Sequence, residues 1–410
     1  MGGSPHAAVF VVDGSVLRRI ELRTELGSAS MSLVHSDAAT ELLGVAGGTA
    51  TGPAQAARAQ VARAMPAAVN RYTKMTLVAA AEGFANHMSD VSRTAKVGDV
   101  GEHVLIAELT RRIGNSQNAI VGIGDDAAVV QLSEPSVAVS TDVLVQDHHF
   151  RLTWSSAADV GRRVAGANLA DVASMGAIPT CLVVGLVLPP ETEVGWVLDF
   201  LDGMAAECEA VGAAVVGGDL AAGPTIMISA TALGDLQGRE PVTRGGARAG
   251  DVVAVAGRLG WAGAGLSLLS RGFKSPRVLV DAHRVPQPPY LSGVLAASAG
   301  AHAMLDVSDG LVTDLGHIAD ASGVSIDIDS ARVPIDDPVR DAAAAFNADP
   351  LAWVLAAGDD HAIAAVFPPA VALPPEFTVI GVAHEAGSEG PIVTVDGVAR
   401  PDLRGFDHFG

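Results

Sequence analysis

The run Ala214-Val215-Val216-Gly217-Gly218-Asp219 decides the fold class of this chain. Its apolar residues predict a short buried strand, and its Gly pair predicts a turn after that strand. Asp219 then carries a carboxylate beyond the strand end, where ligands bind in open α/β sheets. The run therefore predicts an α/β fold in which a strand delivers an acidic side chain to a binding crevice.

Five other segments also place aspartate at the end of an apolar run: Gly124-Asp125-Asp126, Ser140-Thr141-Asp142, Asn168-Leu169-Ala170-Asp171, Asp306-Val307-Ser308-Asp309-Gly310 and Gly358-Asp359-Asp360. Carboxylates about 4 Å apart repel each other by roughly 4 kcal/mol per pair at an effective dielectric constant near 20, so a cluster of them requires a cation. Oxygen ligands from Asp, Ser and Thr suit Mg²⁺, which usually binds together with substrate phosphates. The pattern predicts a metal-assisted phosphate site.

Composition excludes several classes of protein. The 410 residues are 49% hydrophobic and 18% charged, which is typical of a globular protein of two or three domains. A net charge of −20 argues against nucleic-acid binding. Two cysteines, Cys181 and Cys208, are too few for a disulfide framework or a zinc motif and favour a reducing cytoplasm. The longest apolar stretches fall short of the roughly 18 to 20 residues of a membrane helix, so no membrane association is expected.

Charge is distributed unevenly and predicts a boundary near Met88. Residues 1–87 carry seven basic and six acidic residues, which leaves 19 basic and 40 acidic residues for the rest of the chain. We interpret 1–96 as an N-terminal extension of unknown role in which 54–65 forms a weakly amphipathic helix. Two explanations remain open: a small accessory domain, or translation that begins at Met88.

From about Val97 onward, strands alternate with helices. The predicted helices are Glu102–Arg112, Ser155–Met175, Glu191–Val211, Trp261–Ser270 and Val312–Ala321. The predicted strands are Ser136–Ser140, Pro179–Leu188, Ala213–Gly217, Thr225–Leu233, Val252–Ala256, a strand ending at Asp306, Val324–Ile328, Ile363–Phe367, Thr378–Val382 and a hairpin on Asp396-Gly397. The basic, Gly-rich turn Thr243–Arg248 predicts a junction between two α/β domains, 97–245 and 246–410.

These motifs, in this order, resemble the thiamine-monophosphate kinase family of the aminoimidazole ribonucleotide synthetase superfamily. The resemblance covers about residues 98 to 409 and includes Gly122 to Ala128, His149-Phe150 and the closing Gly405-Phe406-Asp407-His408-Phe409. It implies a two-domain architecture of mixed sheets flanked by helices, preceded by the extension. It also implies a homodimer formed through the first domain.

The implied reaction is ATP-dependent phosphorylation of thiamine monophosphate to thiamine diphosphate, assisted by several Mg²⁺ ions. The positions that match the family's metal ligands are Asp126, Ser140, Thr141, Asp142, Asp171, Asp219, Asp306 and Asp309. Those that match its ATP contacts are Gly218, Asp219, Arg244 and Ser308, and those that match its substrate contacts are His149, Asp359 and Phe406. The family usually reads Gly-Glu-Asp-Tyr-Glu where this chain has Gly358-Asp359-Asp360-His361-Ala362, so the substrate acid is one methylene shorter.

The expected chemistry needs no side chain as acid or base, because the acceptor is a phosphate oxygen that is ionised at neutral pH. Catalysis then consists of in-line positioning and neutralisation of charge by metal. Structural alternatives remain for single residues: Asp125-Asp126 in a turn, His149 and Phe406 as structural side chains, and Arg244 on the surface. Another ATP-using enzyme of the same superfamily and a non-catalytic nucleotide- and metal-binding protein remain the alternative functions. Gly272-Phe273-Lys274-Ser275 lacks the second Gly of a P-loop, which excludes that class.

Overall fold

The computed structural model describes residues 7–13, 16–25, 28–34, 91–113, 119–121, 123, 128–133, 135–403 and 405. The chain divides into two compact units, 1–87 and 88–410. In the first unit, strands β1 (Ala7–Asp13), β2 (Val16–Glu25) and β3 (Ser28–Val34) form an antiparallel sheet in the order β1-β2-β3. The predicted helix at 54–65 lies outside the described residues.

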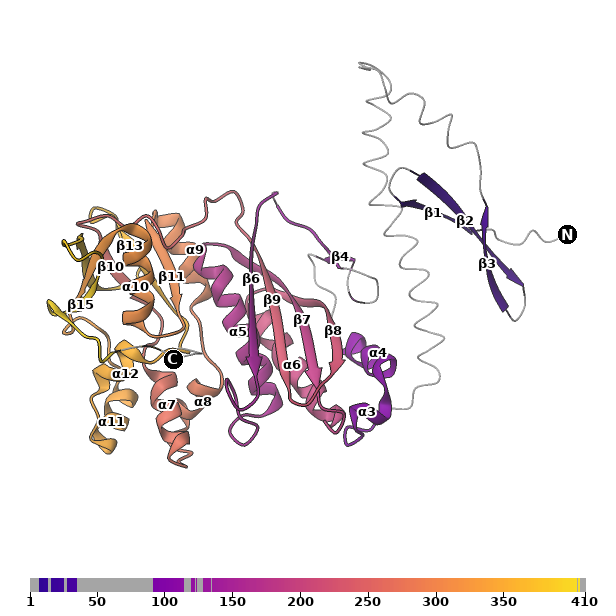
Figure 1. The fold of residues 1–410 in the computed structure, drawn as a ribbon, viewed down its shortest axis with the longest axis horizontal. Helices are drawn as coiled ribbons and strands as arrows, with labels where there is room; N and C mark the ends of the chain where they lie inside the picture. The colour runs from indigo at the N-terminus through magenta and orange to yellow at the C-terminus, as the bar shows by residue number, and fades with distance from the viewer. Residues whose placement is uncertain are drawn as a thin grey trace, which may run out of the picture. The chain divides into compact units, whose positions relative to one another are not determined.

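The second unit begins with a lobe built on a four-stranded sheet. Its strands are β6 (Val137–Val145), β7 (Ile178–Leu188), β8 (Ala214–Ala222) and β9 (Met227–Asp235), in the order β6-β9-β7-β8 that Figure 1 shows. β9 pairs antiparallel with β6 and β7, whereas β7 and β8 are parallel. We call this sheet and its helices the first lobe. Its mixed sheet agrees with the fold class expected from the sequence.

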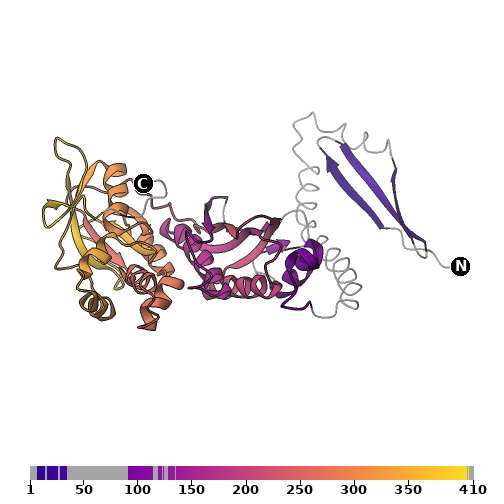
Figure 2. The same ribbon diagram turned by 60° about the horizontal axis from the view of Figure 1, so that its bottom comes forward.

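Two long helices, α5 (Ala157–Ser174) and α6 (Val194–Ala210), cover one side of this sheet (Figure 2). Ser156 begins α5 with a capping box, in which its hydroxyl accepts from the Asp159 N–H and the Asp159 carboxylate accepts from the Ser156 N–H. The helices touch through glycine: a Cβ on Gly161 would lie 1.9 Å from the carbonyl oxygen of Phe200. Smaller elements precede the sheet, namely α3 (Val97–Val100), α4 (Glu102–Arg112), β4 (Ala119–Val121) and β5 (Val129–Val130).

The second lobe contains a seven-stranded sheet in the order β11-β13-β10-β14-β12-β15-β16. Its strands are β10 (Val252–Ala256), β11 (Ala303–Val307), β12 (Val324–Ile328), β13 (Ala362–Phe367), β14 (Thr378–Glu385), β15 (Val393–Val395) and β16 (Val398–Ala399). Its helices are α7 (Trp261–Ser270), α8 (Arg277–Arg284), α9 (Tyr290–Ala299), α10 (Leu311–Ser322), α11 (Asp337–Phe346) and α12 (Pro350–Ala356).

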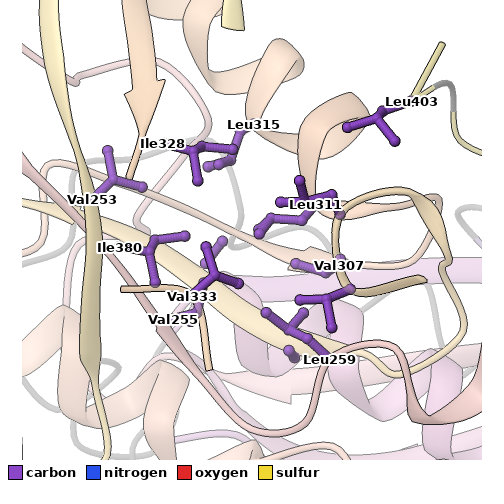
Figure 3. Close-up of a cluster of buried hydrophobic side chains, with 14 of the residues drawn as sticks. Val253, Val255, Leu259, Val307, Leu311, Leu315, Ile328, Val333, Ile380 and Leu403 are labelled. Atoms are coloured by element: carbon purple, nitrogen blue, oxygen red, sulfur yellow. The ribbon is translucent and has the colours of Figure 1, made fainter. Parts of the chain in front are cut away.

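A buried apolar cluster ties α10 to this sheet (Figure 3). Leu311 and Leu315 point from α10 toward side chains of the strands, among them Val307 and Ile328, and all four are fully buried. Burial of such side chains contributes about 1.5–3 kcal/mol each. The cluster therefore fixes the start of α10 beside the end of β11, where Asp306 and Asp309 lie.

The observed elements follow many of the sequence predictions, but helices α8, α9, α11 and α12 were not predicted and two strands of the site are longer than expected. The strand predicted at Ser136–Ser140 is β6, which continues to Val145 and so contains Thr141 and Asp142. The bounds of α4, α7, β10 and β12 are those predicted. The strand at Ala213–Gly217 was predicted too short, because β8 continues through the Gly pair to Ala222. Gly218 permits this continuation, since a Cβ there would lie 2.1 Å from the Val184 carbonyl oxygen on β7. In the part of the chain that the structure describes, no helix combines the length and apolar character needed to cross a membrane.

Candidate active site

The candidate site starts on the helix-covered face of the first lobe. Side chains alternate along a strand, so Ser140 and Asp142 of β6 face the same side, toward α5. The Ser140 hydroxyl donates to Asp171 Oδ2 on α5 at 2.7 Å. The Asn168 amide oxygen accepts from the Asp142 N–H at 3.2 Å, and the Asn168 amide nitrogen donates to the Val164 carbonyl at 2.9 Å. These contacts hold three of the predicted ligand oxygens between β6 and α5.

The second lobe adds further polar groups through Asp306, the penultimate residue of β11. Asp306 is 7% exposed, and its Oδ2 lies 2.9 Å from His361 Nδ1. The backbone N–H of His361 donates to the Val307 carbonyl, so the imidazole is fixed beside the strand that carries Asp306. The two lobes meet here, because the charge of Asp306 acts on both Asp142 and Asp171.

The electrostatics of the group show that these carboxylates are crowded. Burial, followed by the negative charges of Asp306 and Asp142, raises the pKa of Asp171 to about 7, although the hydrogen bond from Ser140 opposes the shift. Burial also raises the pKa of Asp142; the charge of His361 opposes this, and those of Asp306 and Asp309 reinforce it. Burial lowers the pKa of His361, but the hydrogen bond and charge of Asp306 outweigh it and raise the pKa to about 9. The cluster therefore has an excess of negative charge that a bound cation would neutralise.

A second group of potential ligands lies at the start of α10. One oxygen from each of Asp309 and Asp314 and one ring nitrogen of His317 lie within 4.8 Å of one another. Asp314 is 2% exposed, and its Oδ2 accepts from the Asp309 and Gly310 N–H groups, both at 3.0 Å. Burial raises the pKa of Asp314 to about 7. Asp314 therefore fixes the turn that presents Asp309.

Two of the predicted metal ligands lie on the opposite face of the four-stranded sheet. The Thr141 hydroxyl donates to the Ala230 carbonyl at 2.8 Å and lies 3.0 Å from the Thr231 hydroxyl. Asp219 lines a shallow hollow on that face with Gly185, Leu186, Val187, Ala221, Met227 and Ser229. Because β8 lies three strand positions from β6, Asp219 is also about 14 Å across the sheet from Asp142. Thr141 and Asp219 do not join the cluster formed by Asp142, Asp171 and Asp306.

The predicted nucleotide contacts are spread over the second unit. Gly218 lies next to Asp219 on β8, and Ser308 lies between the two predicted ligands Asp306 and Asp309. The exposed Arg244 is in a turn whose carbonyl accepts from the Ser322 hydroxyl at the end of α10. This turn lies about 18 Å, the length of the 12-residue α10, from the end that carries Asp309.

The predicted substrate contacts give a mixed outcome. His149 is half-buried, and its Nδ1 accepts from the Val145 N–H at 3.0 Å, which leaves the proton of a neutral ring on Nε2. Asp359 lies at the boundary of the lobes, where its backbone N–H donates to the Ser308 carbonyl at 2.9 Å. Two predicted site residues lie outside the described residues: the metal ligand Asp126 and the substrate contact Phe406.

Comparison with known proteins identifies the family to which this two-lobed arrangement belongs. The family model "AIR synthase related protein, N-terminal domain" matches residues 124–236, and "AIR synthase related protein, C-terminal domain" matches 248–394. The thiamine-monophosphate kinase of Mycobacterium tuberculosis is 45% identical over 312 residues, which are 76% of this chain and 92% of that protein.

The chain belongs to the thiamine-monophosphate kinase family. A solved thiamine monophosphate kinase from Aquifex aeolicus is 31% identical with a TM-score of 0.60, over 64% of this chain and 89% of that one. A structure of AaThiL complexed with AMPPCP and TMP is 30% identical with a TM-score of 0.62, over 78% and 100% of the two chains. The family and the two-domain fold predicted from the sequence are confirmed.

The segment in which this chain departs from the thiamine-monophosphate kinase pattern is well ordered by its contacts. Asp359 has a φ of 67°, and its Oδ1 lies 2.7 Å from a guanidinium nitrogen of Arg163 on α5. Burial alone would raise the pKa of Asp359, but the positive charge of Arg163 outweighs burial and lowers this pKa below its ordinary value. Asp360 is buried, and its Oδ1 accepts from the Ala262 N–H at the start of α7. Asp359, which stands in place of the family's glutamate, and Asp360, which keeps the family pattern, therefore both have defined partners in the structure.

The donor set fits magnesium. Ser140, Asp142, Asp171, Asp306 and Asp309 supply only oxygen, which is the ligand type Mg²⁺ prefers. The raised pKa of Asp171 indicates that the group resists carrying its full negative charge without a cation.

Three residues of this site were not predicted from the sequence: Arg163, Asp314 and His361. Arg163 is a charged residue among Val160, Val164 and Ala167 on the buried side of α5, and that contrast is a signal the sequence does contain. Asp314 is an acidic residue in the first turn of α10, where the helix dipole and the free backbone N–H groups favour a carboxylate, and that is a signal the sequence contains. The pairing of His361 with Asp306 spans 55 residues and has no local signal.

Proposed function

We propose that this chain transfers the γ-phosphoryl group of ATP to the phosphate of thiamine monophosphate, which yields thiamine diphosphate and ADP. Family membership supports the reaction, since the chain spans 92% of a relative named thiamine-monophosphate kinase. A solved relative binds TMP together with AMPPCP, an ATP analogue. The observation that carries the proposal is the convergence of Asp142 and Asp171 from one lobe with Asp306 from the other.

We propose that this cluster holds several Mg²⁺ ions. Ser140, Asp142, Asp171, Asp306 and Asp309 supply its oxygen ligands. Asp126, Thr141 and Asp219 remain proposed metal ligands from the family resemblance, and Thr141 and Asp219 would bind metal on the other face of the sheet, apart from this cluster. Bound Mg²⁺ would neutralise the charge of the two phosphate-bearing substrates. The chain's own contribution is positioning: the Ser140 hydrogen bond orients Asp171, and His361 orients Asp306. No side chain is required as acid or base, because the acceptor oxygen is already ionised.

The two substrates meet different residues. We propose that Gly218, Asp219, Arg244 and Ser308 contact ATP, and that His149, Asp359 and Phe406 contact thiamine monophosphate. Arg244 has the planar fork of donors that suits phosphate oxygens. Asp359 is 45% exposed, so part of its carboxylate remains accessible to a ligand.

The open face of the four-stranded sheet supports the proposed homodimer. Apolar side chains stand exposed on it, among them Val139 at 59%, Val143 at 49% and Met227 at 39%. Contiguous exposed apolar surface of this kind marks an interaction site. We therefore propose that the first lobe, within the domain 97–245, pairs with a second copy, and that 246–410 completes the nucleotide and substrate site.

We place the protein in the cytoplasm. Cys181 and Cys208 are both free and buried, as expected for a chain that folds in a reducing compartment.

Release of ADP, measured with thiamine monophosphate, with thiamine and without acceptor, tests the proposed function. The proposal requires release that depends on thiamine monophosphate and Mg²⁺ and is lost in Asp142→Asn. Release with thiamine but not with its monophosphate would refute the phosphate acceptor. Binding of ATP without any release would instead support the non-catalytic alternative.

A further inference from the structure

Arg163 is a buried guanidinium that joins the two lobes. It lies on α5, and its side chain is 8% exposed. One terminal nitrogen donates to the His283 carbonyl at the end of α8 at 2.5 Å, and the other lies 2.7 Å from Asp359 Oδ1. The guanidinium is thus held from two sides by the second lobe.

The two side chains of the Arg163–Asp359 ion pair differ in their exposure to solvent. Arg163 is closed off from solvent, whereas the Asp359 side chain is 45% exposed. The backbone of Asp359 is also fixed, with a φ of 67° and a hydrogen bond from its N–H to Ser308. Arg163 therefore restrains one oxygen of a carboxylate whose other side remains open.

The neighbouring Arg162 shows that this arrangement is particular to Arg163. Arg162 pairs with Glu207 on α6, through hydrogen bonds of 3.0 and 2.9 Å to Glu207 Oε2. Two consecutive arginines of α5 thus pair with carboxylates in different lobes. Only Arg163 pairs with the acid that the family resemblance assigns to the substrate.

We propose that Arg163 is a positioning residue for thiamine monophosphate and acts through Asp359. The inference rests on the proposed function, in which Asp359 contacts this substrate. Because Asp359 is one methylene shorter than the glutamate usual in the family, its reach depends on a fixed orientation. With Oδ1 held by Arg163, the other oxygen of the partly exposed carboxylate is the one left to accept a hydrogen bond from the substrate.

The test is the steady-state kinetics of Arg163→Met with both substrates varied. The KM for thiamine monophosphate rises about tenfold or more, as expected when a charge-assisted hydrogen bond loses its orienting partner. The KM for ATP and kcat change less than twofold. Arg163→Lys recovers part of the loss, because it restores the charge but not the fork.

Arg162→Met is the control, since it removes the neighbouring ion pair of the same helix without touching Asp359, although the Arg162 side chain is 44% exposed and that of Arg163 is 8% exposed. Arg163→Lys keeps the test decisive if Arg163→Met does not fold, because it retains a positive charge at the buried position and still raises the KM for thiamine monophosphate more than the KM for ATP. Asp359→Asn raises the same KM, and adding Arg163→Lys to it causes little further rise. Equal increases in both KM values, or an Arg162→Met effect as large as that of Arg163→Met, would show that Arg163 only joins the lobes and would overturn the proposal. If the wild-type chain forms no thiamine diphosphate, the proposed function itself fails.

Discussion

Replacing Asp171 with Asn should stabilise the metal-free protein while it abolishes turnover. Asp171 lies in the field of Asp306 and Asp142, and burial together with these charges raises its pKa from 3.8 to about 7. The folded chain therefore binds a proton at the Asp171 carboxyl more tightly than the unfolded chain does. Its stability falls as the pH rises from about 4 to 7, and the full cost is present above pH 7.

The pKa shift of Asp171 sets the size of the change in the free energy of unfolding. About three pKa units at 1.36 kcal/mol each give an upper bound of about 4 kcal/mol. Since Asp142 and Asp306 share the repulsion, we expect a net gain of about 2–4 kcal/mol for Asp171→Asn at pH 8. The Asn side chain retains an oxygen that accepts from the Ser140 hydroxyl, so the hydrogen bond survives.

Urea unfolding in excess chelator at pH 5.5, 7 and 8.5 measures this gain, with Asp341→Asn as the control on the exposed surface of α11. The advantage of Asp171→Asn should increase with pH and then level off. Adding Mg²⁺ should stabilise the wild type more than the variant and narrow the difference, because the ion binds the folded state. If the variant is no more stable than wild type at pH 8.5, or if its advantage does not change with pH, the ionised Asp171 carboxylate does not destabilise the metal-free fold.

Three further predictions concern the sheet and the nucleotide. Gly218→Ala should cost about 1–3 kcal/mol by thermal unfolding, because its Cβ would meet the Val184 carbonyl at 2.1 Å, whereas Gly217→Ala has open space; equal effects would contradict the close contact. Arg244→Ala should raise the KM for ATP several-fold while the nearby Arg248→Ala does not, and an unchanged KM would remove Arg244 from the nucleotide site. If the proposed homodimer forms through the open face of the four-stranded sheet, Val139→Asp should convert it to a monomer in sedimentation, whereas Val398→Asp, an exposed control, should not; a dimer that persists in Val139→Asp would exclude this face.

The fold could be predicted in detail where the local signals were strong. Apolar runs bounded by Gly or charged residues gave β10 and β12 to the residue, and the Asp396-Gly397 turn does join β15 to β16 with positive φ at both positions. The end of β8 was missed because a Gly pair reads as a turn. In the structure these glycines instead let two strands approach closely, which is a tertiary contact with no local signal.

The candidate site was predictable in its residue types but not in its geometry. Repeated aspartates after apolar runs indicated an oxygen-rich cation site, and Asp142, Asp171 and Asp306 do act on one another. Thr141 points away from Ser140 and Asp142, because the side chains of adjacent residues in β6 face opposite sides of the sheet. The partners Arg163 and His361 come from positions more than 50 residues away from the acids they hold, so spacing alone does not reveal them.

Phosphorus NMR of the purified protein with ATP, Mg²⁺ and thiamine monophosphate follows the transfer of the phosphoryl group from donor to acceptor in one spectrum. We expect loss of the ATP signals, ADP in stoichiometric amount, and a new pair of diphosphate signals in place of the monophosphate signal of the acceptor. Unchanged ATP, or ATP consumed with release of inorganic phosphate while the thiamine monophosphate signal persists, would contradict this transfer.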